Sequence, residues 1–221
     1  MRACATRRAF TTGAILTAAA SLTATPTRQA FAYAWHNTDI TGYVPDLSFN
    51  LTDANTGKQV TQADFKQTVT LLYFGYTQCP DVCPLTLQRV TQVFDKLGKD
   101  KQHFRLLFVT VDPNRDTLPI LKQYTHAFSP LITGLRGDDN AIARLARRYR
   151  IAYSVTPATK DHPYEVTHSS AIYVFTPDGA PRLLLGSLAT TTPDINGTAE
   201  DLEHLLHAQS PGLLSRLIGS L

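Results

Sequence analysis

The chain has 221 residues, of which 43% are hydrophobic and 18% are charged. This composition disfavours wholesale disorder and predicts one compact domain with a sizeable core, since a domain usually takes roughly 100 to 200 residues. The formal net charge of +3 rests on residues 1–32, which hold four arginines and no acid, so the remainder carries 17 basic and 18 acidic residues. A basic nucleic-acid-binding protein is therefore disfavoured, because the remainder lacks a positive surface that neutralises phosphates.

The N-terminal segment predicts export. Residues 1–34 begin with arginines, continue with a stretch rich in Ala, Leu and Thr, and end in small residues spaced for cleavage near Ala32 or Ala34. Within this segment, residues 6–10 (Thr-Arg-Arg-Ala-Phe) resemble the twin-arginine export pattern, which is read by a receptor. The apolar stretch is shorter than the roughly 20 apolar residues that span a bilayer. We therefore predict a cleaved signal and a periplasmic protein, with a retained membrane anchor as the alternative.

Two cysteines, Cys79 and Cys83, lie outside this segment, and Cys4 lies inside it. In the oxidising compartment that export implies, a pair of thiols forms a structural disulfide or serves redox or metal chemistry. A disulfide here would close a loop of only three intervening residues, and stabilisation by a cross-link grows with the length of the loop. The pair is thus predicted to carry chemistry rather than to hold the fold together.

Two strands and a helix are predicted in the first half of the chain. Residues 46–52 alternate between apolar and polar, and turn-forming residues follow at 53–58, which indicates a strand and a hairpin. Residues 69–76 form a nearly continuous β-branched and aromatic run, typical of a strand that is buried on both faces. Apolar residues then recur at helical spacing from Leu85 to Leu97, and Gly98 marks the end of this helix.

The second half of the chain alternates between strands and helices. Strands are predicted at residues 104–111, 131–135, 169–176 and 182–188, and helices at 117–128, from 138 or 139 to 150, and at 198–209. Residues 152–167, which two prolines interrupt, are predicted to be a long loop, and residues 210–221 an amphipathic tail that packs on the core, a membrane or a partner. Together these elements predict an α/β fold in which helices flank a central mixed sheet.

The pair of cysteines lies where a strand ends and a helix begins, within the string Cys79-Pro80-Asp81-Val82-Cys83-Pro84. Open α/β sheets place their sites at the carboxyl ends of strands, and the positive end of a helix dipole favours a thiolate over a thiol. Each cysteine precedes a proline, which disfavours α geometry, so a shaped loop is predicted across both.

The spacing and the other donors decide between kinds of chemistry. Thioredoxin-type oxidoreductases have two residues between their cysteines, whereas this chain has three. Two thiolates suit a soft ion such as Cu(I), and an added imidazole would also suit Cu(II). Structural zinc sites use four protein ligands, and no third cysteine is available outside the N-terminal segment. Copper is therefore the predicted metal.

Three further stretches carry a resemblance to a known family. Leu72-Tyr73-Phe74-Gly75-Tyr76-Thr77 leads into the cysteines, Val109–Thr117 reads Val-Thr-Val-Asp-Pro-Asn-Arg-Asp-Thr, and His168-Ser169 precedes an apolar strand and Pro177-Asp178-Gly179. With these stretches, residues 42–209 resemble the Sco/SenC family, thioredoxin-fold proteins that help to assemble the copper A centre of cytochrome c oxidase.

This resemblance implies a thioredoxin-like copper-binding domain over residues 42–209, with copper, as Cu(I) or Cu(II), bound by Cys79, Cys83 and His168. It also implies cytochrome c oxidase subunit II as a partner, together with a thiol reductant and a copper donor. The chain departs from the family at Thr167, where an aspartate usually precedes the histidine and helps to orient its ring. Glu165 is the candidate to replace that carboxylate.

Several assignments stay open between a functional and a plainer interpretation. Asp112 and Asp116 resemble a pair of acids, but turn formation and helix capping explain them better. The arginines of the helix that begins near Asp138 form either a solvated face or a patch for an acidic partner. Cys79 and Cys83 would also serve a thiol-disulfide oxidoreductase that reduces its partner's copper-site cysteines. A peroxidase is disfavoured, because the usual proline, threonine and cysteine spacing is absent upstream of Cys79.

Overall fold

The structure, a computed structural model, describes residues 33–208, and those from Ala34 onward lie in one compact unit. All but the last two residues of the predicted export signal lie outside the described residues, as does the whole predicted tail. Among the described helices, none combines the length and the apolar character needed to cross a bilayer.

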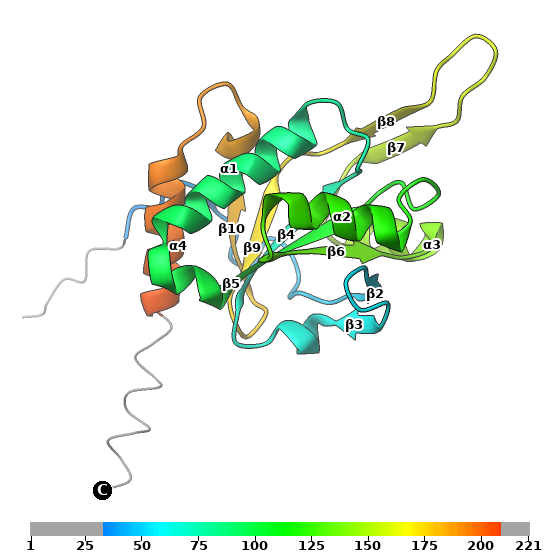
Figure 1. Cartoon of the computed structure of the whole chain (residues 1–221). Coiled ribbons are helices and arrows are strands. Elements are labelled where there is room, and N and C mark those ends of the chain that lie inside the picture. The colour runs from blue at the N-terminus through cyan, green and yellow to red at the C-terminus, as the bar shows by residue number, and fades with distance from the viewer. Residues whose placement is uncertain (1–32, 209–221) are drawn as a thin grey trace, which may run out of the picture. The chain divides into compact units, whose positions relative to one another are not determined.

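Eight strands form one mixed sheet at the centre of the unit (Figure 1). Their order across the sheet is β1 (Thr38–Asp39), β10 (Pro181–Leu185), β9 (Ile172–Phe175), β4 (Val69–Gly75), β5 (Phe104–Thr110), β6 (Ile132–Arg136), β2 (Asn50–Asp53) and β3 (Gln59–Thr61). The central strands β4, β5 and β6 are parallel, while β9 runs antiparallel to β4. Every residue of β4 is buried, which confirms the prediction of a strand covered on both faces.

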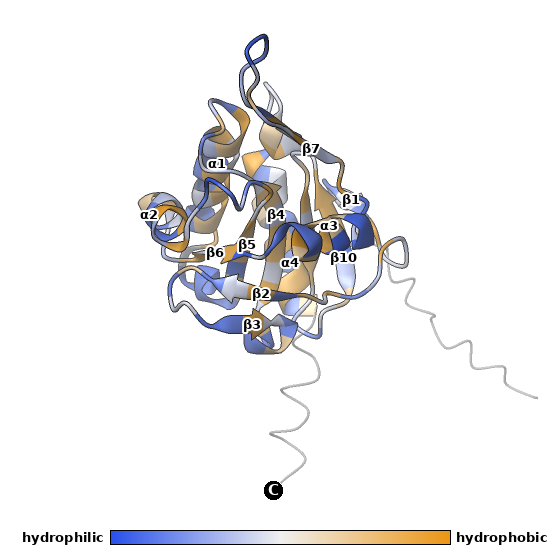
Figure 2. Ribbon diagram, turned by 90° about the vertical axis from the view of Figure 1, so that its right-hand side faces the viewer, coloured by the Kyte–Doolittle hydropathy of each residue, from blue (hydrophilic) through white to orange (hydrophobic). Residues whose placement is uncertain are grey.

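Four helices flank this sheet: α1 (Val82–Lys96), α2 (Leu118–Phe128), α3 (Asp139–Arg148) and α4 (Ile195–Ala208). In Figure 2, α1 and α2 lie on one side of the central strands and α3 on the other, with the apolar residues gathered between them. Short 3-10 helices lie between the other described elements at Gln62–Phe65, Gly98–His103 and Ser187–Ala189. The predicted α/β class, with helices around a mixed sheet, is confirmed.

The helix ends follow the sequence signals. Asp138 caps α3 by accepting a hydrogen bond from the backbone N–H of Ala141 at 2.6 Å. Gly98 follows α1 with φ +56°, a left-handed conformation that glycine adopts without strain. The arginines of α3 and its end are exposed, and Arg148 donates to the carbonyl of Asp46 at 2.9 Å.

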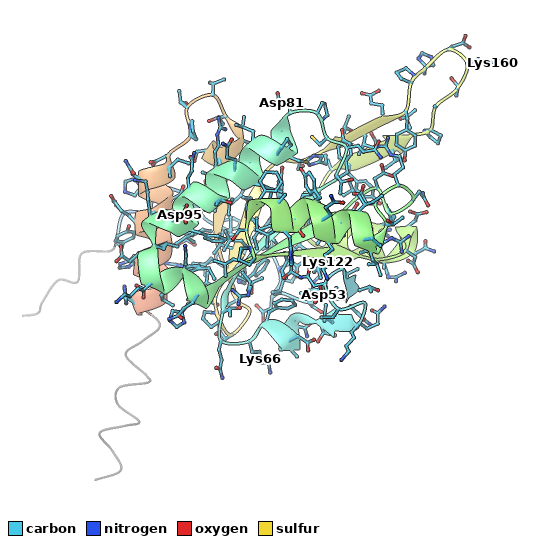
Figure 3. All side chains as sticks on the ribbon, viewed as in Figure 1. Asp53, Lys66, Asp81, Asp95, Lys122 and Lys160 are labelled. Atoms are coloured by element: carbon cyan, nitrogen blue, oxygen red, sulfur yellow. The ribbon has the colours of Figure 1, made fainter. Side chains whose placement is uncertain are left out.

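One predicted loop is wrong and proves to be a hairpin. Strands β7 (Tyr153–Thr156) and β8 (Glu165–His168) pair with each other in a separate two-stranded sheet. The two prolines that suggested a loop lie between these strands, where they break no ladder. The hairpin extends away from the body in Figure 1, and Figure 3 places Lys160 at its tip. His168 is therefore the last residue of β8 and does not begin β9.

Candidate metal centre

The structure brings the three predicted ligands together, although they come from three different elements. Cys79 lies in the loop after β4, Cys83 in the first turn of α1 and His168 at the end of β8. Cys79 Sγ, Cys83 Sγ and a ring nitrogen of His168 all lie within 4.8 Å of one another, and His168 Nε2 is 3.1 Å from Cys83 Sγ. The cysteines are free thiols rather than a disulfide. This arrangement can hold a metal ion.

The loop geometry predicted across both cysteines is correct for Cys79 but wrong for Cys83. Helix α1 begins at Val82, next to Asp81 (Figure 3), so Cys83 is its second residue and Pro84 its third. A proline is tolerated in the first turn because the N–H groups there have no partner within the helix. The helix start thus fixes Cys83 firmly and leaves Cys79 on the loop.

Gly75, the last residue of β4, makes room for the buried sulfur. A Cβ atom added at this position would lie 2.7 Å from the ring of Phe108 and 2.9 Å from Cys83 Sγ. Both distances are too short for real contacts, so a side chain here would displace one neighbour or the other. Sequence reasoning treated Gly75 as part of a family string and missed this steric role.

The two thiols have opposite electrostatic surroundings. A hydrogen bond from the side chain of Cys83 is the largest influence on Cys79, and it outweighs burial to lower the pKa of Cys79 to about 4. The backbone N–H of Cys83, at the positive end of α1, adds a contact to Cys79 Sγ at 3.4 Å. The same thiol–thiol hydrogen bond, together with burial, raises the pKa of Cys83. At neutral pH the site therefore presents a thiolate at Cys79 and a buried thiol at Cys83.

This difference predicts the pH dependence of alkylation of the reduced protein. The rate at which iodoacetamide modifies Cys79 should be half-maximal near pH 4 and reach a plateau at neutral pH, while Cys83 stays unreactive. Peptide mapping of the alkylated protein distinguishes the two cysteines. Because the folded-state pKa lies below the ordinary value of about 8.5, the Cys79 thiolate contributes stability above pH 8.5 that is lost as the pH falls toward 4. In Cys83→Ala the half-maximum should move upward; a half-maximum near pH 8 in the unaltered protein would contradict this account.

The ring of His168 is oriented by a backbone carbonyl. His168 Nδ1 lies 2.9 Å from the carbonyl oxygen of Ser169, and since a carbonyl can only accept, the proton is on Nδ1. The lone pair of Nε2 therefore faces Cys83 Sγ, which is the tautomer that a metal ligand needs. The rings of Tyr73 and Tyr76 hold the imidazole in edge contacts, with centroids 6.1 and 5.8 Å away.

The structure also shows what orients the His168 ring when residue 167 is a threonine rather than an aspartate. The hydroxyl of Thr167 pairs with that of Ser154 at 2.8 Å, and the suggestion that Glu165 replaces the missing carboxylate is wrong, because Glu165 lies at the far end of β8, opposite Thr156. The carbonyl of Ser169 supplies the outer partner that fixes the tautomer and the ring. A backbone acceptor leaves no residue-type signal, which is why sequence reasoning missed it.

Two buried hydroxyls beside Cys83 make no hydrogen bond of regular geometry with the described residues, although they lie close to each other and to the sulfur of Cys83. They belong to Tyr73 and to Thr86, which follows Cys83 by one turn of α1, and both residues are fully buried. Burial, and next the sulfur of Cys83, raise the pKa of Tyr73. Unpaired buried hydroxyls are costly, and a thiolate accepts hydrogen bonds far better than a thiol. These donors fit a state in which the sulfur of Cys83 is deprotonated and bound to a metal.

A hollow of about 300 Å³ leads to the donors from the surface. Its lining comes from the thiol loop, the start of α1 and the end of β8: Tyr76, Cys79, Pro80, Asp81, Val82, Val166, Thr167, His168 and Ser170. The more exposed sulfur of Cys79 borders this hollow, whereas Cys83 is buried behind it. Two sulfur donors and one imidazole match the ligands that suit copper, so the residues present fit that metal.

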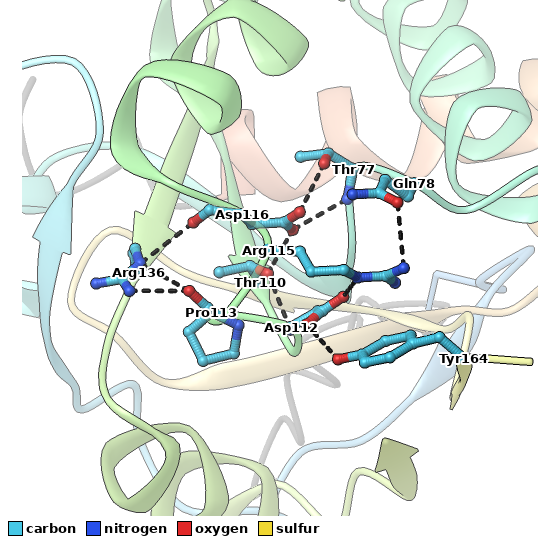
Figure 4. Close-up of polar contacts among 9 residues, drawn as sticks. All are labelled: Thr77, Gln78, Thr110, Asp112, Pro113, Arg115, Asp116, Arg136 and Tyr164. Atoms are coloured by element: carbon cyan, nitrogen blue, oxygen red, sulfur yellow. Dashed lines mark hydrogen bonds and ion pairs between the residues drawn. The ribbon is translucent and has the colours of Figure 1, made fainter. Parts of the chain in front are cut away.

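The loop after β5 connects the thiol loop to the hairpin (Figure 4). Asp116 was predicted to cap α2 or form a turn, but its carboxylate accepts from the backbone N–H of Thr77 and from the hydroxyls of Thr77 and Thr110, all within 3.0 Å. Thr117 precedes α2 instead, with no side-chain cap. The capping role is therefore wrong for Asp116, which ties down the residues before Cys79.

Asp112 plays a similar part toward the hairpin. Its carboxylate accepts from the hydroxyl of Tyr164 at 2.8 Å and pairs with Nε of Arg115. The guanidinium of Arg115 lies 3.8 Å from the centre of the Tyr164 ring and donates to Gln78 Oε1 at 3.1 Å. Sequence reasoning did not connect Arg115 or Tyr164 with the site. The hydrogen bond that brings Tyr164 there joins it to Asp112, 52 positions earlier in the chain.

Comparisons with known proteins agree with this geometry. The family model described as SCO1/SenC matches residues 42–207. A bovine mitochondrial protein, "Protein SCO2 homolog", is 42% identical over 133 residues, which cover 59% of this chain and 50% of the relative. The chain thus spans about half the length of the curated relatives it matches.

Solved structures give the same picture. ScoI of Bradyrhizobium japonicum, solved with copper bound, is 38% identical, covers 72% of this chain and 98% of its own, and superposes with a TM-score of 0.62. Yeast Sco1 with copper bound is 29% identical, covers 75% and 90% of the two chains, and gives a TM-score of 0.65. The predicted thioredoxin-like fold is confirmed by these neighbours.

Proposed function

The chain belongs to the SCO1/SenC family, and on that premise we propose that it binds one copper ion through Cys79, Cys83 and His168 and serves in the assembly of cytochrome c oxidase. The observation that carries the proposal is that two sulfurs and an imidazole nitrogen lie within 4.8 Å of one another. Relatives solved with copper bound support the choice of metal.

Cys79, Cys83 and His168 act at different steps in the binding and release of the ion. Cys79, already a thiolate and bordering the hollow, makes the first bond to an arriving copper ion. Cys83 would release its proton to solvent as its sulfur binds the ion in place of the thiol–thiol hydrogen bond, and His168 would add the lone pair of Nε2. Release proceeds by ligand exchange and begins at the same sulfur, since thiolates of an apo partner can reach Cys79 before the buried Cys83.

We assign the partner and the compartment within the same proposal. The receiving site is the copper A centre in cytochrome c oxidase subunit II, and a copper donor and a thiol reductant supply the metal and keep the cysteines reduced. The signal pattern of residues 1–34 supports export to the periplasm, with attachment to the membrane as the alternative.

Copper titration of the reduced protein tests the proposal. The protein should hold about one equivalent of copper, and His168→Ala should weaken binding of Cu(II) far more than binding of Cu(I), because two thiolates alone satisfy Cu(I). His103→Ala, a change at a histidine exposed outside the site, is the matched control and should bind like the unaltered protein. Failure to bind copper, or equal binding without His168, would overturn the ligand assignment.

A thiol-disulfide oxidoreductase is the second candidate function, favoured by the pairing of an accessible thiolate with a buried thiol in contact. Cys79 would attack a disulfide in the partner and Cys83 would resolve the mixed disulfide, which releases a dithiol partner and leaves a disulfide here. His168→Ala separates the two functions: a reductase should still support oxidase assembly in cells, whereas a copper carrier should not.

A further inference from the structure

The histidine of the site stands on a hairpin outside the central sheet, whose side chains Tyr153, Val155, Tyr164 and Val166 pack against the core. Strands β7 and β8 pair only with each other, and an isolated two-stranded hairpin is marginally stable in water. His168 is the last residue of β8, so the position of its ring depends on what ties this hairpin to the body.

Within the described part of the chain, one hydrogen bond besides the contacts of His168 with Cys83 and Ser169 joins residues 153–168 to the body. It runs from the hydroxyl of Tyr164 to Asp112 Oδ1 at 2.8 Å, just before β8 begins. The acceptor is held in place: Asp112 lies two residues after the end of β5, is 1% exposed, and donates its backbone N–H to Thr110 Oγ1 at 3.0 Å. The hairpin is therefore anchored to a buried residue just beyond the carboxyl end of β5.

Arg115 extends this anchor to the loop that carries Cys79. Its guanidinium stacks on Tyr164 on one side, pairs with Asp112, and donates to Gln78, the neighbour of Cys79 (Figure 4). It also lies 5.9 Å from the ring centre of Tyr76, which contacts His168. A planar cation suits this position, since it pairs in its plane and stacks on its face at once.

From these contacts we propose that Asp112, Arg115 and Tyr164 form a clamp that holds His168 over the two sulfurs, and that the clamp sets how tightly the protein keeps Cu(II) relative to Cu(I). This inference rests on the proposed copper function. Tyr164 and Arg115 are positioning residues, because they act through the hairpin and the thiol loop. A loosened clamp leaves both thiolates in place for Cu(I) and removes the imidazole that Cu(II) requires.

Tyr164→Phe tests the clamp, because it removes only the anchoring hydroxyl and keeps the ring beneath Arg115. Affinities for Cu(I) and Cu(II), each measured by competition with a chelator of known affinity, should show a Kd for Cu(II) raised about tenfold and a Kd for Cu(I) nearly unchanged. The nitrogen hyperfine signal of bound Cu(II) in electron paramagnetic resonance should weaken. In the metal-free protein, the backbone amides of β7 and β8 should exchange hydrogen faster.

Tyr153→Phe is the matched control, since it makes the same change on the same hairpin at a hydroxyl that takes no hydrogen bond within the described residues. It should match the unaltered protein in every measurement. Arg115→Lys, which keeps the charge but loses the stacking plane, should repeat the effect of Tyr164→Phe. Equal effects on the two oxidation states, or none in either variant, would overturn the clamp. An unaltered protein that binds no copper would instead overturn the proposed function on which it rests.

Discussion

Replacement of Cys83 by serine is expected to remove copper binding while the fold stays intact. Cys83 is fully buried, contacts Cys79 and His168, and gives the only sulfur placed on a helix in the described site. Loss of a direct ligand should cost more than the roughly 100-fold in affinity that loss of an outer partner costs. Copper per protein after dialysis, with circular dichroism of the same samples, measures both parts of the prediction.

Cys79→Ser should lose copper as well, but by a different route. This sulfur borders the hollow and is the thiolate at neutral pH, so its loss removes the point of entry for the metal. The variant should also lower the unfolding free energy of the metal-free protein at neutral pH, because it removes the thiolate that the fold stabilises. A single-cysteine protein that retained a full equivalent of copper against a competing chelator would refute the two-sulfur site.

Gly75→Ala is expected to lower both the stability of the fold and its metal binding. The added Cβ would overlap the ring of Phe108 and the sulfur of Cys83, both of which are buried and cannot retreat into solvent. Overpacking of this kind costs about 1–3 kcal/mol, which exceeds the gain of about 0.4–1 kcal/mol from a stiffer unfolded chain. The free energy of unfolding and the copper affinity should therefore both fall.

Gly186→Ala provides the control for this substitution. A Cβ at Gly186 meets no atom within 4 Å, and its φ of −97° is one that alanine adopts readily. Its unfolding free energy and copper affinity should equal or slightly exceed those of the unaltered protein. If both alanine variants behaved alike, the steric role assigned to Gly75 would be wrong.

Much of the fold was predictable because it is encoded locally. The unbroken apolar run of β4, the helical spacing that ends at Gly98 and the turn before β10 each specify an element from neighbouring residues alone. The position of Cys79 and Cys83 followed from the same reasoning, since a strand end and a helix start place them.

The remainder depends on contacts between distant residues. The hairpin of β7 and β8 was missed because Pro157 and Pro163 suggested a loop, while the short strands beside them alternate over only four residues each. The approach of His168 to the sulfur of Cys83, 85 positions earlier, and the anchoring of Tyr164 on Asp112 leave no periodic signal in the sequence. Family resemblance named His168, and the structure supplies the physical reason that its ring faces the sulfurs.

X-ray absorption at the copper edge of the loaded protein tests the central claim most directly. The account predicts two sulfur neighbours and one imidazole nitrogen per copper, with the imidazole scattering lost in His168→Ala. A copper environment made of nitrogen and oxygen alone, or an imidazole signal that persists in His168→Ala, would contradict it.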